Sequence, residues 1–164
     1  IKILRRFPNQ IAIGGFLRET VALASFNGRV QAVSRDGYLI GAPEAEADTL
    51  PVIKGLQKQK VHAGVPVADE RLTTALQIID FAARDRVLAD AGLRSVNIDD
   101  LDKIVCVFGR DKALFDVFVE KDKGLAKFRD LSIILGRGNL DLSGVKYVDL
   151  RFDEPVIGKK KTRK

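Results

Sequence analysis

Few residues of this chain can carry acid–base, nucleophilic or metal chemistry, and they lie apart in the sequence. His62 is the only histidine and Cys106 the only cysteine, so a zinc site or a hydrolase triad lacks its usual partners. The acidic residues at 99–102, and the pair Asp153 and Glu154, are of the type that hydrogen-bonds its own backbone in turns. We therefore expect no catalytic residues, no metal and no cofactor, and we expect that the protein is not an enzyme.

Two further motifs have structural explanations. The stretch GRGNLD at 136–141 contains a GxG but lacks the spacing of nucleotide-binding glycine motifs, so we interpret it as a turn. Cys106 lies in the apolar run KIVCVF, where a lone thiol is expected to be a small buried side chain.

The basic end of the chain leaves two interpretations open. The net charge is +6, and five Lys or Arg residues lie in the last six positions, KKKTRK at 159–164. Such a cluster attracts nucleic acid or anionic lipid by releasing counterions. It is also typical of a solvated terminus, and no aromatic residue interrupts it to stack on bases. We expect 159–164 to be a disordered basic tail.

Turn signals and alternating apolar residues predict a sheet. Asn27-Gly28 and Asp36-Gly37 are typical of hairpin turns and predict a meander from 21 to 40. Strands are also expected at 1–7, 11–19, 95–98, 103–108 and 113–119, with a short extended segment at 50–55 after a surface loop at 42–49.

Two stretches have helical periodicity. Residues 69–91 predict one long helix with Asp69 as its N-cap and Gly92 as its stop. Its apolar stripe is Leu72, Ala75, Leu76, Ile79, Ala82, Ala83 and Val87. A shorter helix is expected at 123–135. The predicted class is α+β: a curved, mostly antiparallel sheet with two amphipathic helices on one face.

The C-terminal stretch VKYVDLRFDEPVIGKK at 145–160 predicts two short strands around a turn marked by Pro155. Alternation places one set of side chains in the core, namely Val148, Leu150 and Phe152, and a second set on the other face, namely Tyr147, Asp149 and Arg151. A strand at the end of a chain has an edge that is either blunted or paired.

Length and composition fit one domain or two small ones. The chain has 164 residues, and its hydrophobic content of 46% is ordinary for a packed core. No apolar run approaches the ~18 residues of a membrane span. The chain begins with Ile1 and contains no Met, so we expect it to be a piece of a longer protein.

Five motifs in order resemble the extracytoplasmic part of the bacterial cell-division family FtsQ, also called DivIB. They are RRFPNQIAI at 5–13, RETVALASFNG at 18–28, VSRDGYLI at 33–40, LPVIKG at 50–55 and KYVDLRF at 146–152. Together they spread over nearly the whole chain. Two departures are Thr20-Val21, where the family usually has proline, and GGF at 14–16 in place of a regular alternation.

The resemblance implies a non-enzymatic scaffold of the divisome. It implies a single-pass protein of the bacterial inner membrane, with this fragment on the periplasmic side and the membrane span missing. Residues 1–20 would be the last strands of a truncated POTRA domain, residues 21–158 the β domain, and 159–164 the basic tail. The implied partners are the proteins FtsB and FtsL, which relay activation to septal peptidoglycan synthesis, with no nucleic acid.

The resemblance also implies a site. FtsQ-like proteins pair a C-terminal edge strand with a segment of FtsB by β-augmentation. The implied partner-binding residues are Tyr147, Arg151, Phe152, Pro155, Val156, Ile157 and Gly158. Three alternatives remain: Pro155 and the lysines only blunt the edge, the tail binds nucleic acid, or the chain is a POTRA-like periplasmic assembly factor.

Overall fold

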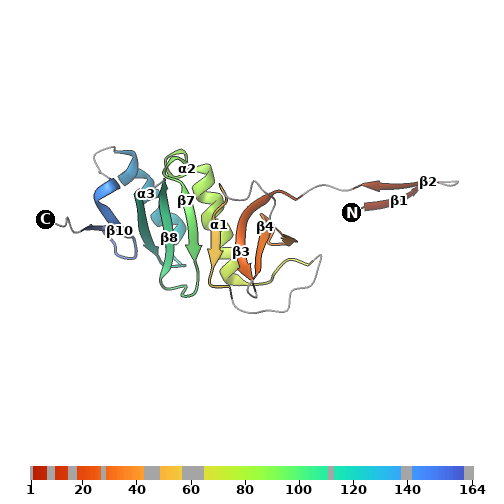
Figure 1. Cartoon of the computed structure of the whole chain (residues 1–164), viewed down its shortest axis with the longest axis horizontal. Coiled ribbons are helices and arrows are strands. Elements are labelled where there is room, and N and C mark those ends of the chain that lie inside the picture. The colour runs from red at the N-terminus through yellow and green to blue at the C-terminus, as the bar shows by residue number, and fades with distance from the viewer. Residues whose placement is uncertain are drawn as a thin grey trace.

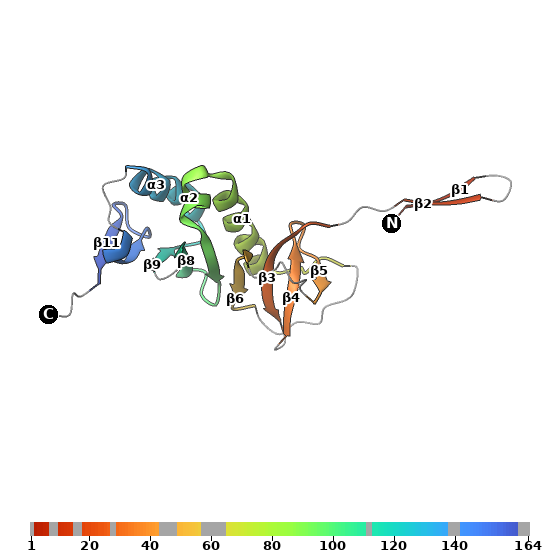
Figure 2. The same ribbon diagram turned by 45° about the horizontal axis from the view of Figure 1, so that its top comes forward.

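The computed structural model describes residues 2–6, 10–14, 18–26, 29–42, 49–56, 65–110, 113–137 and 142–160. His62 and the tail at 161–164 lie outside these ranges. The described residues form an α+β fold, as predicted, in which helices cover one face of a large sheet (Figures 1 and 2).

The large sheet has nine strands in the order β11-β10-β9-β8-β7-β6-β3-β4-β5. Their bounds are β3 (Thr20–Phe26), β4 (Arg29–Ser34), β5 (Leu39–Gly41), β6 (Val52–Lys54), β7 (Leu93–Asn97), β8 (Ile104–Arg110), β9 (Ala113–Val119), β10 (Val145–Asp149) and β11 (Val156–Lys159). A separate hairpin of β1 (Lys2–Arg6) and β2 (Gln10–Gly14) precedes it (Figure 1). The predicted division into one domain at 1–20 and another at 21–158 stays a prediction.

The large sheet is mixed rather than purely antiparallel. Its parallel pairs are β3–β6, β6–β7 and β9–β10, and the other neighbours are antiparallel. Helices connect β6 to β7 and β9 to β10. A helical crossover carries the chain back to the end of the sheet at which the first strand began, so the two strands it joins run parallel.

The predicted meander is confirmed. β3 pairs with β4 and β4 with β5, both antiparallel. The turn after β4 contains Gly37 with φ of 79°, a left-handed conformation that glycine adopts without steric cost. Its N–H donates to the carbonyl of Ser34 (3.0 Å) and closes the turn.

The predicted single helix at 69–91 is wrong, because the structure has two helices there. They are α1 (Glu70–Arg84) and α2 (Arg86–Ala91), separated by Asp85 in an extended conformation. The Asp85 carboxylate accepts hydrogen bonds from the N–H groups of Val87 and Leu88 and so caps α2. It also accepts one from Ser132 of α3 (Gly124–Gly136). The described fold therefore has three helices where two were expected.

The helix ends follow the sequence signals. Asp69 caps α1 by accepting a hydrogen bond from the Arg71 N–H (2.8 Å), and Gly92 ends α2 with φ of 75°. Both were predicted.

The buried side chains differ in part from the predicted apolar stripe. Leu72, Ala75, Ile79 and Ala82 are buried as predicted, whereas Leu76 and Val87 are only half-buried and Ala83 is exposed. Ile78 of α1 is buried in addition. In α2, Leu88 is buried in place of Val87, because α2 does not continue the helical phase of α1.

The core fills the space between the helices and the sheet. Phe108 of β8 stacks on Phe115 of β9 with ring centroids 6.1 Å apart, and Phe128 of α3 lies 6.3 Å from Phe108. Cys106 is fully buried beside them, and burial raises the pKa of its thiol. Among the residues that the structure describes, no α-helix lies on the opposite face of the sheet (Figure 2). Among the described residues, no helix is long and apolar enough to span a bilayer.

Candidate partner-binding edge at the C-terminal strand

The C-terminal strand β11 is the outermost strand on one side of the nine-stranded sheet. It pairs antiparallel with β10, from Asp149↔Val156 to Val145↔Lys159. In the described part of the chain no other strand pairs with it. One side of its backbone is therefore open to an added strand.

The outward backbone groups of β11 can be assigned from one hydrogen bond. The N–H of Lys160 donates to the Gly144 carbonyl (2.8 Å), so this position faces back toward the sheet. Along an antiparallel edge strand, successive residues direct their N–H and C=O alternately toward the neighbour and away from it. The outward positions are therefore Lys159 and Ile157.

Pro155 occupies the next outward position in this alternation. Proline has no N–H. At an outward position of an edge strand the missing N–H would not have faced β10, so no hydrogen bond to β10 is lost. Pro155 thus limits the pairing edge to the stretch that follows it. The edge is short, which is also how sheets commonly avoid uncontrolled pairing.

Gly158 and Tyr147 fit together on the face of the sheet that lacks helices. Gly158 pairs with Tyr147 across β10 and β11. A Cβ atom at Gly158 would overlap the Tyr147 ring, so the ring lies directly against the glycine backbone. The same ring packs on Phe118 of β9, with centroids 5.5 Å apart and planes tilted by 37°. This packing fixes the position of β11 relative to β9 and β10.

An ion pair orders the start of the β10–β11 connection. Arg151 donates from Nε and Nη2 to the two carboxylate oxygens of Asp149, at 3.0 and 2.7 Å. Asp149 is buried. The hydrogen bond from Arg151 holds its pKa below the usual value, although burial acts in the opposite direction. Such a bidentate pair keeps the connection in one geometry.

Two cations lie near the Phe118 ring on this face. Nζ of Lys103 is 5.2 Å from the ring centroid and the guanidinium carbon of Arg151 is 5.9 Å from it. Neither Phe118 nor Lys103 is among the residues predicted from the sequence. The two-residue alternation of β9 could have identified Phe118, because it buries Phe115 in the core and leaves Phe118 on the opposite face.

The structure places every predicted partner-binding residue in β10, β11 or the connection between them. Phe152 and Val156 are the exposed members, at 56% and 45%. The half-buried members are Tyr147, Arg151, Pro155, Ile157 and Gly158. Of these, Ile157 packs against the helix-covered core.

The predicted core position of Phe152 is wrong. Val148 and Leu150 are buried as predicted, at 0% and 1% exposure. Strand β10 ends at Asp149, and 151–154 form bends. The two-residue alternation stops with the strand, so Phe152 turns outward.

Charges differ between the two ends of β11. Asp153 and Glu154 are exposed before the strand, and Lys159 and Lys160 are exposed at its end beside Lys146 of β10. A strand added along β11 would therefore pass from an acidic to a basic environment.

The chemistry available at this edge is non-covalent. Within the described ranges, no group of His, Cys, Asp and Glu is arranged to hold a metal. In the acidic stretch at 99–102, Asp100 accepts a hydrogen bond from the Asp102 N–H (2.9 Å), which is the predicted turn geometry. The open edge of β11 has the geometry to accept an extended chain, and its described residues offer no nucleophile–base pair or metal-binding group.

The fold and this edge define a class: an α+β domain with a mixed sheet, helices on one face, and a C-terminal strand open for pairing. Comparison with protein-family models finds no match, and comparison with curated protein sequences finds none either.

Proposed function

We propose that this chain is an extracytoplasmic fragment of an FtsQ/DivIB-type divisome scaffold, and that it binds FtsB through β11. FtsL would join through the same assembly, and the role in septum formation would be to hold partners rather than to catalyse a reaction. The whole protein would be anchored in the bacterial inner membrane by a span outside this sequence. Residues 1–20 would belong to a POTRA domain.

The observation that carries the proposal is the position of β11. A strand at the end of the chain forms the sheet edge, and its outward groups at Ile157 and Lys159 are suited to β-augmentation, in which main-chain bonds supply affinity. Phe152 and Val156 are exposed apolar side chains beside that edge. The order of the five FtsQ-like motifs supports the same function.

A proline substitution tests the outward edge directly. Lys159→Pro removes one outward N–H and leaves the bonds to β10 in place, because Lys159 does not face β10. The matched control is Lys159→Ala, which removes the charge and keeps the N–H. Calorimetry would measure the affinity of each for the extracytoplasmic segment of FtsB from the same genome.

We expect Lys159→Pro to bind at least about fivefold more weakly, since leaving a buried partner carbonyl unsatisfied costs about 1–3 kcal/mol. Lys159→Ala should remain within about threefold of the original, because an exposed charge pair contributes little. Unfolding free energies should change by less than about 1 kcal/mol in both, as for most surface substitutions. Equal affinity for the two variants would refute pairing at β11.

Two other outcomes would favour the alternatives. RNA affinity that falls steeply with salt and disappears without 159–164 would indicate a nucleic-acid tail. Comparable binding of many unrelated extended peptides would indicate an assembly factor with unselective clients.

A further inference from the structure

The open edge at β11 carries opposite charges at its two ends. Asp153 and Glu154 precede the strand and are exposed. Lys159 and Lys160 stand at its end and are exposed as well. Within the described part of the chain, none of these four side chains forms an ion pair. The exposed apolar side chain of Val156 lies between the two ends, so the edge is acidic, then apolar, then basic.

This order of charges is complementary to itself. The two strands of an antiparallel pair run in opposite directions. A second copy of β11 added antiparallel would therefore place its basic end beside the acidic end of the first copy, and two-fold symmetry would repeat the contact at the other end. A second copy added parallel would instead bring like charges together, which is destabilising.

The outward backbone groups of β11 allow such a pair. Residues that exchange main-chain hydrogen bonds across an antiparallel pair must both face outward, and the outward residues of β11 are Ile157 and Lys159. With the two-fold axis at Ile157, its N–H and C=O bond to Ile157 of the second copy. The N–H of Lys159 then donates to the carbonyl of Pro155 in the second copy. Pro155 has no N–H, but this bond requires only its carbonyl.

The side chains favour this register over its neighbour. With the axis at Ile157, Glu154 comes opposite Lys160 of the second copy, where cross-strand Cβ atoms are roughly 5 Å apart. Val156 comes opposite Gly158, which is covered by the Tyr147 ring, so the exposed valine gains an apolar contact. An axis at Gly158 would also join outward groups, but it would place Lys160 opposite the apolar Val156.

The described residues leave room for a second copy. β11 is the outermost strand, and it lies at one end of the sheet, whereas the β1–β2 hairpin lies beyond the other end (Figure 2). Because β11 is only four residues long, the shared edge is short. A small interface of this kind is typical of weak association.

We propose that two copies of this chain pair antiparallel through β11, centred on Ile157, and form a weak dimer with one continuous sheet. The pairing itself does not depend on the partner proposed above. One consequence does rest on that proposed function: a second copy and a partner strand would use the same outward groups, so each would exclude the other from the edge.

Two charge-reversal variants of the full chain test the pairing. Glu154→Lys and Lys160→Glu each place like charges opposite each other at both ends of the dimer. An equimolar mixture restores opposite charges at both contacts, because each variant supplies the charge that the other lacks. Sedimentation velocity at low salt, over a range of concentrations, measures the self-association. We expect each variant alone to associate about tenfold more weakly than the original chain, and the mixture to return to within about threefold of it.

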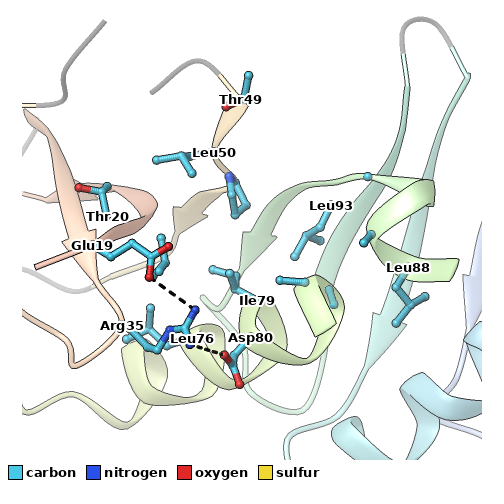
Figure 3. Close-up of a pocket in the computed structure, with 16 residues that line it drawn as sticks. Glu19, Thr20, Arg35, Thr49, Leu50, Leu76, Ile79, Asp80, Leu88 and Leu93 are labelled. Atoms are coloured by element: carbon cyan, nitrogen blue, oxygen red, sulfur yellow. Dashed lines mark ion pairs between the residues drawn. The ribbon is translucent and has the colours of Figure 1, made fainter. Parts of the chain in front are cut away.

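The control variant has the same net charge as Glu154→Lys. Glu19→Lys reverses an exposed acidic residue that pairs with Arg35 beside β3 (Figure 3), and β3 is separated from β11 by five strands of the sheet. It should associate like the original chain. NMR spectra recorded on dilution should shift the amides of Ile157 and Lys159.

Three outcomes would overturn the proposal. They are an original chain that stays monomeric up to about 1 mM, a mixture of the reversed variants that associates no better than either alone, and a Glu19→Lys chain that is weakened as much as Glu154→Lys. No partner is present in these measurements, so their failure would leave the partner-binding test at β11 unaffected.

Discussion

Substitution of Gly158 tests the packing that positions the candidate edge. In Gly158→Ala, the added Cβ would overlap the Tyr147 ring, which cannot move freely because it packs on Phe118. Gly158 does not have a left-handed φ, so the penalty is steric. Overpacking costs about 1–3 kcal/mol, and the loss of glycine freedom in the unfolded chain returns about 0.4–1 kcal/mol. The expected net destabilisation is about 0–2.6 kcal/mol on these values.

A double-mutant cycle isolates the cause. Tyr147→Ala removes the obstructing ring, so Gly158→Ala should cost little stability in the Tyr147→Ala background. The two changes should therefore be non-additive by about 1–2 kcal/mol, in the range of contacting residues. Urea unfolding followed by circular dichroism measures each free energy.

The matched control is Gly136→Ala at the end of α3. A Cβ there meets only Val87, at an ordinary 3.6 Å, and alanine is the better helix former by about 0.5–1 kcal/mol. It should be neutral or stabilising. Additivity within about 0.5 kcal/mol in the Gly158–Tyr147 cycle would show that the ring does not restrain the strand.

Two further predictions concern the same end of the sheet. Leu150→Ala should destabilise the fold by about 2–5 kcal/mol, because it is a large-to-small change at a buried site. Val156→Ala at an exposed site should cost less than about 1 kcal/mol. Urea unfolding measures both, and similar values for the two would contradict the assigned core. The Asp149 carboxyl has a lowered pKa in the folded state, so it contributes stability above the unfolded value of about 4, and that stability is lost as pH falls through the lower folded pKa. Unfolding free energies measured down this acidic range should fall less steeply in Arg151→Gln, and identical profiles would show that the pair does not set the shift.

Local sequence rules predicted the elements whose determinants are neighbours in the chain. The turn at Gly37, the cap at Asp69 and the stop at Gly92 each depend on residues within one turn of the backbone. Amphipathic spacing likewise predicted α3, at 123–135 against Gly124–Gly136. The terminal edge strand followed from its place at the end of the chain and from the family resemblance.

The tertiary structure decided features whose partners lie far apart in sequence. Asp85 interrupts the helical pattern and is held by Ser132, which is 47 positions away, so periodicity alone extends the helix through it. The parallel pairings depend on how the crossovers pack, and the exposure of Phe152 depends on where β10 stops pairing. The Tyr147 ring over Gly158 and the ion pair of Arg35 with Asp80 exist only because distant strands and helices become neighbours. Alternation and periodicity report which face a residue takes within its own element, whereas these contacts are set by which elements become neighbours.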